Sequence, residues 1–577
     1  MRKPKPLFYK VFVISLLLAT IALTGCGGGE DNPVRSSSTE PVEYENANIT
    51  VEQPNTIYTI ENKDAVNIAV DVAADGADYL INIESKSRSE IYVELVPSAS
   101  NAFSERLSVA EGSCRSFESY EARIALEAGL MARKSFVEAV RASKACSNTE
   151  NTSTRASRQV AYPYSDHSRE ILGNEYTFQL ENPYSNRALV TLNRCKLVHE
   201  TSNAKFFVDQ DSHGLSFDAS KMESWIKGSD GTTGLAEAFD NGTSYSMYSV
   251  LEKNFGKIAD VDGDGKVSIL VSSVLTSFYR GLQGLFPYET MIVHKEDYPS
   301  NSVTDFRDLL IIDPVTCGDD AKGRQTMLNN LIHEAQHVVN FSARAFNSDN
   351  NYIGFDFSAF DAELGFDEGM SVCAEALFRR AWGTEGGKRY IYQFRDNGPI
   401  VEYAGNSDRF SSYTLNNIYP FNVFNPSYHY GRNGLFMLYL HDRFGDSAFK
   451  ELIQQGWKGQ ALNTEIPRVL NCEADFNTLQ KEWHIAIQNE YLRTAQRKTT
   501  ANSFGQKYAY GDWLNLKSEN MTLFSPSKPV SSSVSPLCYH LKATNKNPEA
   551  TYRFFVKSSD GKASLKDLVI NLIKLSE

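Results

Sequence analysis

The sequence predicts an α+β protein in which a helix-rich core is flanked by β-rich modules. Helical spacing of apolar residues prevails from about residue 215 to 495, whereas period-two alternation marks residues from about 49 to 96 and from about 505 to 577. A length of 577 residues predicts several domains. Apolar residues make up 41% of the chain and aromatic residues 12%, which is enough to build packed cores.

The first 25 residues resemble a bacterial lipoprotein signal peptide. Four basic residues precede an apolar run over residues 11–23, which is shorter than the roughly 20 residues that span a membrane. Leu23-Thr24-Gly25-Cys26 resembles a lipobox, in which the peptide is cut before the cysteine and the thiol is acylated. An ordinary signal peptide with an incidental Cys26 is the alternative. We expect a lipid anchor at Cys26 that holds the protein to a membrane of the cell envelope, outside the cytoplasm, on the outer membrane or cell surface.

Charge and cysteine usage exclude some classes of function. The net charge is −13, and without the signal peptide 54 basic residues face 71 acidic ones, a charge of −17. Nothing in this balance favours a nucleic-acid partner. Seven cysteines remain after Cys26, without a Cys-x-x-Cys pair, so a cysteine zinc site is not expected. In an oxidising envelope some would pair, and their odd number leaves at least one unpaired within the chain.

Composition shifts divide the chain into predicted segments. They are a signal peptide (1–25), a tether (26–48), an N-terminal β-rich region with a helix and a polar linker (49–160), a second β-rich section (161–210), a helix-rich domain that contains the motifs described below (211–500) and a C-terminal β-rich domain (501–577).

Residues 328–339 contain a His-Glu-x-x-His motif on a predicted helix. Their apolar residues recur at spacings of three and four, which is the helical period. His333 and His337 would project from one face, one turn apart, as two nitrogen ligands of one Zn²⁺ ion would require. Glu334 is placed to accept a proton from a zinc-bound water. A structural helix with two buried histidines is the alternative.

A catalytic zinc ion also needs a third protein ligand and one open position. About thirty residues further on, segment 364–378 predicts a second helix, with Glu368 near its start and Glu375 two turns later on the same face. We expect Glu368 to be the third ligand. Glu363 and Asp367 are alternatives, but Glu363 precedes the helical pattern and Asp367 points about 100° away from Glu368.

These motifs resemble those of known metallopeptidases. His-Glu-x-x-His followed at this distance by Asp367-Glu368-Gly369 resembles the gluzincins, and the sequence from His333 to Phe341 is similar, more narrowly, to the hyicolysin family of neutral metallopeptidases. The likeness extends to Phe255-Gly256, to residues 260–270 and to residues 430–440, and covers about residues 205 to 500.

The resemblance implies a thermolysin-like fold and a zinc-dependent endopeptidase that hydrolyses protein or peptide substrates. It makes His333, His337 and Glu368 the zinc ligands and Glu334 the catalytic base. One position departs from the pattern: many gluzincins carry an Asp four residues after the ligand Glu, to steady a ligand histidine, and here that residue is Val372. Glu375 is the candidate for this supporting role.

A peptidase also needs a hydrogen-bond donor for the oxyanion. In related peptidases a Tyr just before a helix has this role, and residues 427–431 precede a predicted apolar helix. Tyr430 fits best, and Tyr428 and His429 are alternatives. Because the chain contains 29 Tyr, a packing role for this Tyr-rich tract is the competing interpretation.

Asp260, Asp262 and Asp264, followed by Gly265, match the opening of an EF-hand-type Ca²⁺ loop. The twelfth position, normally Glu, is Val271, so the full motif fails. A Ca²⁺ site and a simple Asp-Gly turn are both compatible with this pattern.

Other functions remain open at this stage. The β-rich flanks and the tether would also suit a surface lipoprotein that acts mainly as an adhesin or binding protein. An intact His-His-Glu set with its base Glu334 argues against a purely structural role. An aminopeptidase is less favoured, because we find no Gly-x-Met-x-Asn-type tract upstream of the zinc motif.

Overall fold

The structure is a computed structural model, and all of the residues that it describes belong to one compact unit, Tyr44–Glu577. The described ranges are 45–47, 57–61, 67–75, 78–85, 92–97, 167–181, 189–211, 217–228, 233–278, 282–292, 306–350, 352–353, 360–384, 426–455, 462–476, 478–480, 482–483, 485–486, 522–524, 530–533, 537–542, 546–558, 565–566 and 568–574. The predicted signal peptide, Cys26, most of the tether, and the helix and linker expected between residues 117 and 157 lie outside these ranges.

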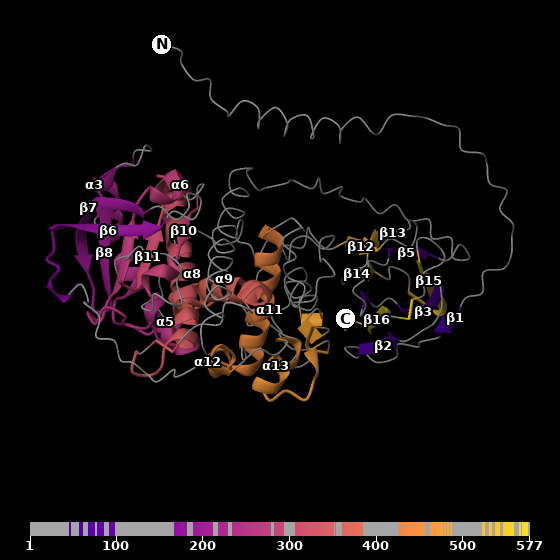
Figure 1. Ribbon diagram of the computed structural model, residues 1–577. Helices are drawn as coiled ribbons and strands as arrows, with labels where there is room; N and C mark the ends of the chain where they lie inside the picture. Colours follow the sequence, from indigo (N-terminus) through magenta and orange to yellow (C-terminus); the bar gives the residue numbers. More distant parts are fainter. Residues whose placement is uncertain are drawn as a thin grey trace, which may run out of the picture. The chain divides into compact units, whose positions relative to one another are not determined.

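Helices and strands are mixed, as the α+β prediction required (Figure 1). The helices are η1 (His167–Arg169), α3 (Ala219–Lys227), α4 (Leu235–Phe239), α5 (Met247–Asn254), α6 (Val274–Phe278), η2 (Tyr288–Thr290), α7 (Pro314–Cys317), α8 (Ala321–Ala345), α9 (Phe360–Thr384), α11 (Pro426–Phe444), α12 (Ser447–Gln455) and α13 (Leu462–Val469).

A six-stranded mixed sheet forms the frame of the helix-rich part, in the order β10-β11-β9-β8-β7-β6. Its strands are β6 (Glu175–Glu181), β7 (Leu189–Glu200), β8 (Ala204–Asp209), β9 (Val267–Val271), β10 (Gly284–Leu285) and β11 (Leu309–Ile312). β8, β9 and β11 run parallel, whereas β10 pairs antiparallel with β11 at one edge. The predicted boundary at residue 210 is therefore wrong, because strands before and after it share this sheet.

The three parallel strands are buried along their whole length, and most of their residues are apolar, with Lys205, Asp209 and Ser268 as buried polar exceptions. Successive side chains point to opposite faces of the sheet. Phe206 and Ile269 enter a large core that also contains the apolar face of α8, whereas Phe207 and Leu270 enter a second core with α6. This packing fixes α8 against one face of the sheet.

Helix α8 is longer than the predicted segment 328–339. Asp320 caps it, since its Oδ1 accepts a hydrogen bond of 2.8 Å from the backbone N–H of Gly323. The buried side chains of Leu331, Ile332 and Val338 tie its inner face to the core. Burial of such side chains contributes about 1.5–3 kcal/mol each, which outweighs any single helix-propensity term.

Helix α9 packs against both α8 and α11. It begins at Phe360, so the prediction that Glu368 lies near its start and that Glu363 precedes it is wrong. The apolar period fades around Gly365, but one glycine costs a helix interior only about 1 kcal/mol and does not end it. At Gly369 a Cβ atom would stand 2.8 Å from Cβ of Asn433, so only glycine allows α9 and α11 to approach this closely.

The flanking β segments, predicted as separate modules, share two five-stranded sheets. One sheet has the order β1-β3-β15-β5-β13 and the other β12-β14-β4-β16-β2. The strands are β1 (Glu45–Ala47), β2 (Ile57–Glu61), β3 (Asn67–Asp75), β4 (Asp78–Ser85), β5 (Tyr92–Pro97), β12 (Thr522–Phe524), β13 (Val530–Ser533), β14 (Leu537–Lys542), β15 (Lys546–Ser558) and β16 (Leu568–Lys574). Long antiparallel pairings join β3 to β15 and β4 to β16, so the β module needs both segments.

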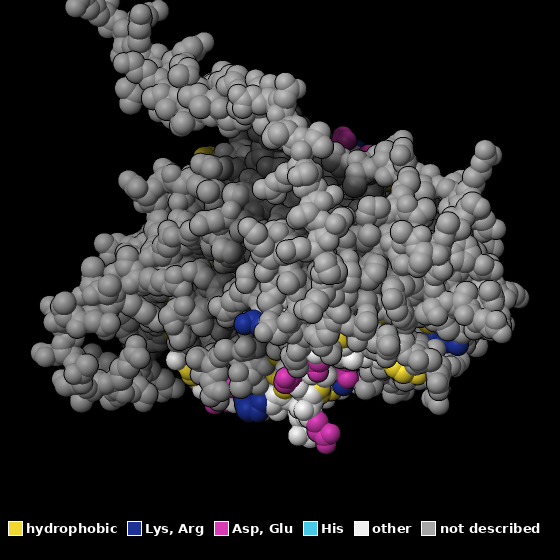
Figure 2. Space-filling view, turned by 90° about the vertical axis from the view of Figure 1, so that its right-hand side faces the viewer, with side chains coloured by type: hydrophobic (Ala, Val, Ile, Leu, Met, Phe, Trp, Pro, Cys, Tyr) yellow, Lys and Arg dark blue, Asp and Glu magenta, His cyan; other side chains and the backbone are white. Residues whose placement is uncertain are grey.

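Surface charges of the described residues are mixed. On the face that Figure 2 shows, acidic side chains lie close to Lys and Arg side chains. Ion pairs between exposed groups include Lys253–Asp446 at 2.9 Å and Arg194–Glu175 at 2.9 Å. Such exposed pairs contribute little to stability.

Candidate metal centre

His333 and His337 lie one turn apart on the inner side of α8. Their ring centroids are 5.0 Å apart. Both are buried, with exposed fractions of 8% and 1%. The two imidazoles of the His-Glu-x-x-His motif therefore share one face of a rigid, capped helix, as predicted.

Glu368 reaches the two histidines from α9. Its Oε2 lies 3.1 Å from Nε2 of His333 and 3.5 Å from Nε2 of His337. The carboxylate is 1% exposed. The structure thus brings together His333, His337 and Glu368, which offer three ligand atoms within 4.8 Å of one another.

These distances fit a tetrahedral zinc ion. Zinc ligands stand about 2.0–2.1 Å from the metal, so two ligand atoms of a tetrahedral set are about 3.3 Å apart. The two nitrogen-to-oxygen separations, 3.1 and 3.5 Å, bracket this value. Two imidazoles and a carboxylate are also a donor set that suits zinc. The separations from Glu368 to both histidines therefore fit a zinc ion.

A second carboxylate stands behind each histidine. Oε1 of Glu375 lies 3.0 Å from Nδ1 of His333, in the position expected for a supporting residue. Oδ2 of Asp367 lies 2.8 Å from Nδ1 of His337. A carboxylate at Nδ1 fixes the ring and makes Nε2 the nitrogen that would bind a metal. The residue at the position of the family's usual Asp, Val372, is instead buried in the core.

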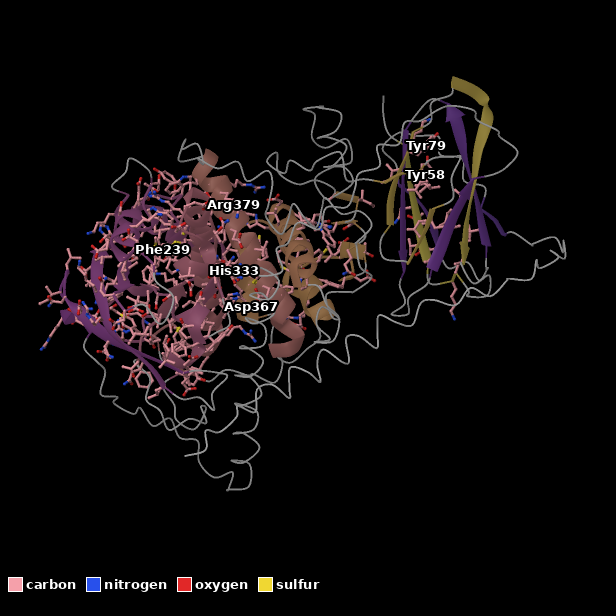
Figure 3. All side chains as sticks on the ribbon, turned by 90° about the horizontal axis from the view of Figure 1, so that it is seen from above. Tyr58, Tyr79, Phe239, His333, Asp367 and Arg379 are labelled. Carbon is pink, nitrogen blue, oxygen red and sulfur yellow. The ribbon has the colours of Figure 1, made fainter. Side chains whose placement is uncertain are left out.

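Further contacts hold these carboxylates in place. Arg379 donates a hydrogen bond of 2.9 Å to Glu375, and Asn340 donates one to Asp367. Asp367 and Arg379, both on α9, lie on either side of His333 in Figure 3. Both carboxylates that α9 places beside the histidines are thus held by further hydrogen bonds.

The charge of this site calls for a cation. Burial alone would lower the pKa of His333, but the carboxylates of Glu368 and Glu375 raise that pKa to about 10. An additional proton on the imidazole therefore compensates part of the buried negative charge. Zinc binds the neutral imidazole, so it would take the place of this proton.

Glu334 lies beside the ligands but is held by the sheet. Its Oε2 accepts a hydrogen bond of 3.0 Å from the backbone N–H of Phe286, directly after edge strand β10. At Gly284, within β10, a Cβ atom would stand 2.8 Å from Cγ of Glu334. Glycine at this position lets the edge strand and the carboxylate come together.

The predicted oxyanion donor does not lie in a loop before a helix. Residues 427–431, which include Tyr428, His429 and Tyr430, belong to α11 itself, which begins at Pro426. Pro426 suits the first turn of a helix, and the Tyr-rich tract after it continues the helical segment. The side chains of these residues lie outside the described part of the structure, so the role of Tyr430 stays a prediction.

The remaining sequence predictions have separate outcomes. Asp260 and Asp262 lie together, but their third neighbour is Asp308, and Asp264 pairs with Lys205 at 2.6 Å. Among the described residues Cys195, Cys317, Cys373 and Cys472 are free thiols. No helix within the described ranges combines the length and apolarity needed to cross a membrane.

Comparisons with known proteins add no relative: no family model and no curated protein matches the chain.

Sequence reasoning missed the partner of His337. Asp367, Ser371 and Glu375 follow one another at intervals of four residues along α9. Ser371 Oγ also lies 3.2 Å from Nδ1 of His337. A polar stripe at this spacing on an otherwise buried helix was the available signal, because such groups need polar partners.

Proposed function

We propose that this protein is a zinc-dependent endopeptidase of the gluzincin type with a thermolysin-like core. The observation that carries the proposal is the convergence of three ligand atoms from His333, His337 and Glu368, with Glu334 beside them. Two helices in contact and a mixed sheet with an edge strand at the site support a thermolysin-like arrangement.

The roles of the side chains follow from their positions. His333, His337 and Glu368 hold the ion, which when bound supplies a Lewis acid that polarises a carbonyl group and acidifies water. Glu334 accepts the proton of the attacking water and passes it to the leaving amine. The hydrogen bond from Phe286 keeps this carboxylate beside the ligands. We assign oxyanion stabilisation to Tyr430, as the sequence predicts.

A peptide substrate is favoured by the position of β10. This strand is the last in the order of the six-stranded sheet, and it adjoins Glu334 through Gly284 and Phe286. An extended peptide can add to such an edge by main-chain hydrogen bonds. A chain added there would lie beside the proposed base, which suits cleavage within a polypeptide.

The proposal is tested by metal analysis together with proteolysis. The purified chain should contain one zinc ion and should cleave casein. Removal of zinc with 1,10-phenanthroline should abolish cleavage, and added Zn²⁺ should restore it. A correctly folded, zinc-loaded chain that leaves casein and a mixed peptide library intact would refute the proposal.

A surface binding protein is the second candidate. The two five-stranded sheets formed by strands of residues 45–97 and 522–574 favour it by analogy, because many cell-surface domains are built from two β-sheets. The two functions are separable, since binding of a partner by this module should survive the loss of Glu334 and peptide hydrolysis should not.

We also propose that Cys26 carries a lipid anchor and that the protein faces outward from the bacterial envelope. The lipobox-like tract before Cys26 is the support. The variant Cys26→Ala should move from the detergent phase to the aqueous phase on partitioning. Wild-type partitioning of this variant would contradict the anchor.

A further inference from the structure

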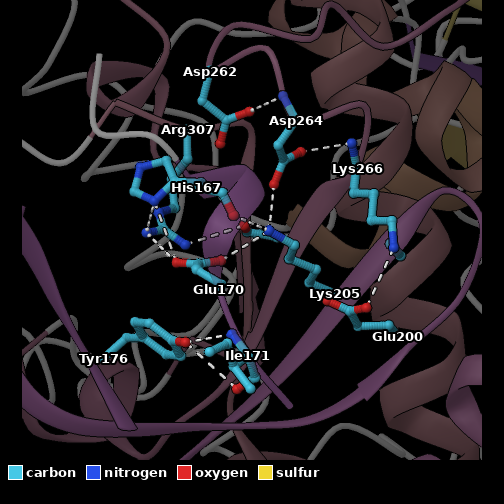
Figure 4. A network of polar contacts seen from close by, with 12 residues as sticks. His167, Glu170, Ile171, Tyr176, Glu200, Lys205, Asp262, Asp264, Lys266 and Arg307 are labelled. Carbon is cyan, nitrogen blue, oxygen red and sulfur yellow. Dashed lines mark hydrogen bonds and ion pairs between the residues drawn. The ribbon is translucent and has the colours of Figure 1, made fainter. Parts of the chain in front are cut away.

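A second group of carboxylates lies at the amino ends of β9 and β11. Residues 260–266 form the loop before β9. Oδ1 of Asp262 accepts from the backbone N–H of Asp264 at 3.3 Å, and Oδ1 of Asp264 accepts from that of Lys266 at 2.7 Å (Figure 4). Gly263 lies between these aspartates at a φ of 76°, which glycine adopts without strain. The loop is thus folded back on itself.

Asp308 joins this loop because of the sheet topology. It directly precedes β11, which runs parallel to β9, and its carbonyl accepts a hydrogen bond of 2.9 Å from the backbone N–H of Ser268. Parallel neighbours begin at the same edge of a sheet. A residue about 45 positions further along the chain therefore lies beside the loop, which local sequence patterns did not reveal.

The carboxylates of Asp260, Asp262 and Asp308 lie close together. One oxygen of each carboxylate is buried and has no hydrogen-bond partner. Their ligand oxygens lie within 4.8 Å of one another. The buried atoms without a partner are Oδ1 of Asp260, Oδ2 of Asp262 and Oδ1 of Asp308. Asp262 is 7% exposed and Asp308 2% exposed. Buried charges without a partner are costly, so this arrangement calls for a cation.

The basic side chains nearby make their hydrogen bonds to other groups, although the charges of His167 and Arg307 also act on Asp262. Lys205 Nζ donates to Asp264 at 2.6 Å and to Glu170 at 3.0 Å. Arg307 donates to Glu170 at 3.0 Å and to Ser268 at 3.3 Å. Figure 4 shows this network beside Asp262. None of these bonds reaches the three unpartnered oxygens.

The pKa values of Asp262 and Asp308 are consistent with a site that attracts a cation. Burial and the charge of Asp264 raise the pKa of Asp262. Burial and the charge of Asp262 raise the pKa of Asp308. Burial and the repulsion between like charges therefore both disfavour three ionised carboxylates here in the absence of a cation.

We propose that Asp260, Asp262 and Asp308 bind a calcium ion, at a site distinct from the zinc centre. Three carboxylates and no nitrogen or sulfur donor favour a hard cation. Ca²⁺ accepts six to eight oxygen ligands in flexible geometry, which backbone carbonyls and water can complete, whereas Mg²⁺ demands a near-ideal octahedron. Asp308, directly before the neighbouring strand β11, replaces the glutamate that an EF-hand carries in its own loop. The ion would tie the loop to the start of β11.

Calcium binding is tested on the zinc-loaded full chain, by equilibrium dialysis against ⁴⁵Ca²⁺ in the presence of excess Mg²⁺. We expect one Ca²⁺ per chain in the wild type. Asp308→Asn should weaken binding by more than the ~10–100-fold typical of a lost supporting residue. Asp349→Asn, at an exposed aspartate, should bind as the wild type does. Absence of Ca²⁺ binding to the folded wild type, unchanged binding in Asp308→Asn, or equal affinity for Mg²⁺ would each overturn the proposal.

Thermal unfolding gives an independent measure. Ca²⁺ should raise the Tm of the wild type by at least ~2 °C and should not change that of Asp308→Asn. In the absence of Ca²⁺ the variant should be at least as stable as the wild type, because the amide removes a buried like charge. Should Asp308→Asn fail to fold, Asp262→Asn tests the same expectations. Neither measurement involves proteolysis, so the inference does not depend on the proposed peptidase activity.

Discussion

Asp367 and Glu368, consecutive residues of α9, contact the two nitrogens of one imidazole. Oδ2 of Asp367 lies 2.8 Å from Nδ1 of His337, and Oε2 of Glu368 lies 3.5 Å from its Nε2. Contacts at both ring nitrogens therefore fix the orientation of the His337 ring relative to α9. A small shift of α9 would alter the ligand and its support together.

We expect Asp367→Ala to weaken zinc binding by ~10–100-fold without removing a ligand. The imidazole of His337 would lose the carboxylate that fixes its orientation. Competition with a chelator of known affinity measures the change. Asp349→Ala, at an exposed position, is the matched control. Equal zinc affinity in wild type and Asp367→Ala would show that the contact does not support the metal.

Glu334→Gln should retain zinc and lose nearly all turnover. The amide keeps the shape of the side chain but cannot accept the proton of the attacking water. The loss should appear in kcat, measured with a fluorogenic peptide, at unchanged metal content. Glu252→Gln, which alters a surface residue of α5, should have wild-type kinetics. Near-normal turnover in Glu334→Gln would exclude this carboxylate as the base.

Glu368→Ala should lower zinc occupancy sharply, whereas Glu363→Ala should not. Both positions lie on α9, so Glu363 is not on a preceding loop, and its direction on the helix distinguishes it from Glu368. Five residues along a helix correspond to a rotation of about 140°, which directs position 363 away from the face of Glu368. Elemental analysis of both purified variants decides between them. Loss of zinc in Glu363→Ala alone would reverse the ligand assignment.

Glu170→Gln should destabilise the protein at neutral pH. Burial opposes the charge of Glu170, but the hydrogen bond to His167 and the charges of Arg307 and Lys205 outweigh it and hold the pKa of the carboxyl at about 2, below the usual 4.5. The charged form therefore contributes stability that is present above about pH 4.5 and is lost as the pH falls through about 2.

We expect a loss of about 2 kcal/mol for Glu170→Gln at pH 7, as for other buried hydrogen-bonded groups. The difference from wild type should shrink as the pH falls below 4.5 in denaturant unfolding. Glu175→Gln, which breaks an exposed pair with Arg194, should have little effect at any pH. A constant difference across this pH range would contradict the role of the charge.

Local sequence patterns were sufficient to identify the residues at the centre of the candidate metal site. The helical period around His333 and His337 and the Asp-Glu-Gly tract identified the residues that the structure brings together. Local pattern did not predict where helix α9 begins. Polar residues before Glu368 weaken the apolar period, although the helix already starts at Phe360. Asp367 was considered only as a rival ligand, since its partner is on another helix.

Contacts between distant segments could not be predicted in the same way. Asp308 meets the loop of Asp262 only because β9 and β11 are parallel neighbours. Alternation identified the strands at both ends of the chain but carries no information about which strands pair. Two features therefore appeared only in the structure. The two flanking β segments share their sheets, and the six-stranded sheet contains strands from both sides of residue 210.

The pairing of β3 with β15 and of β4 with β16 has a consequence for biogenesis. Roughly 470 to 480 residues separate the partner strands, so the loop-closure entropy is large and neither sheet can be completed during the synthesis of its first half. The edges of β3 and β4 that pair with β15 and β16 therefore stay unpaired until these later strands have been synthesised. Until then, the edges of β3 and β4 are exposed to aggregation and proteolysis, so correct folding of this module depends on protection of these edges during synthesis.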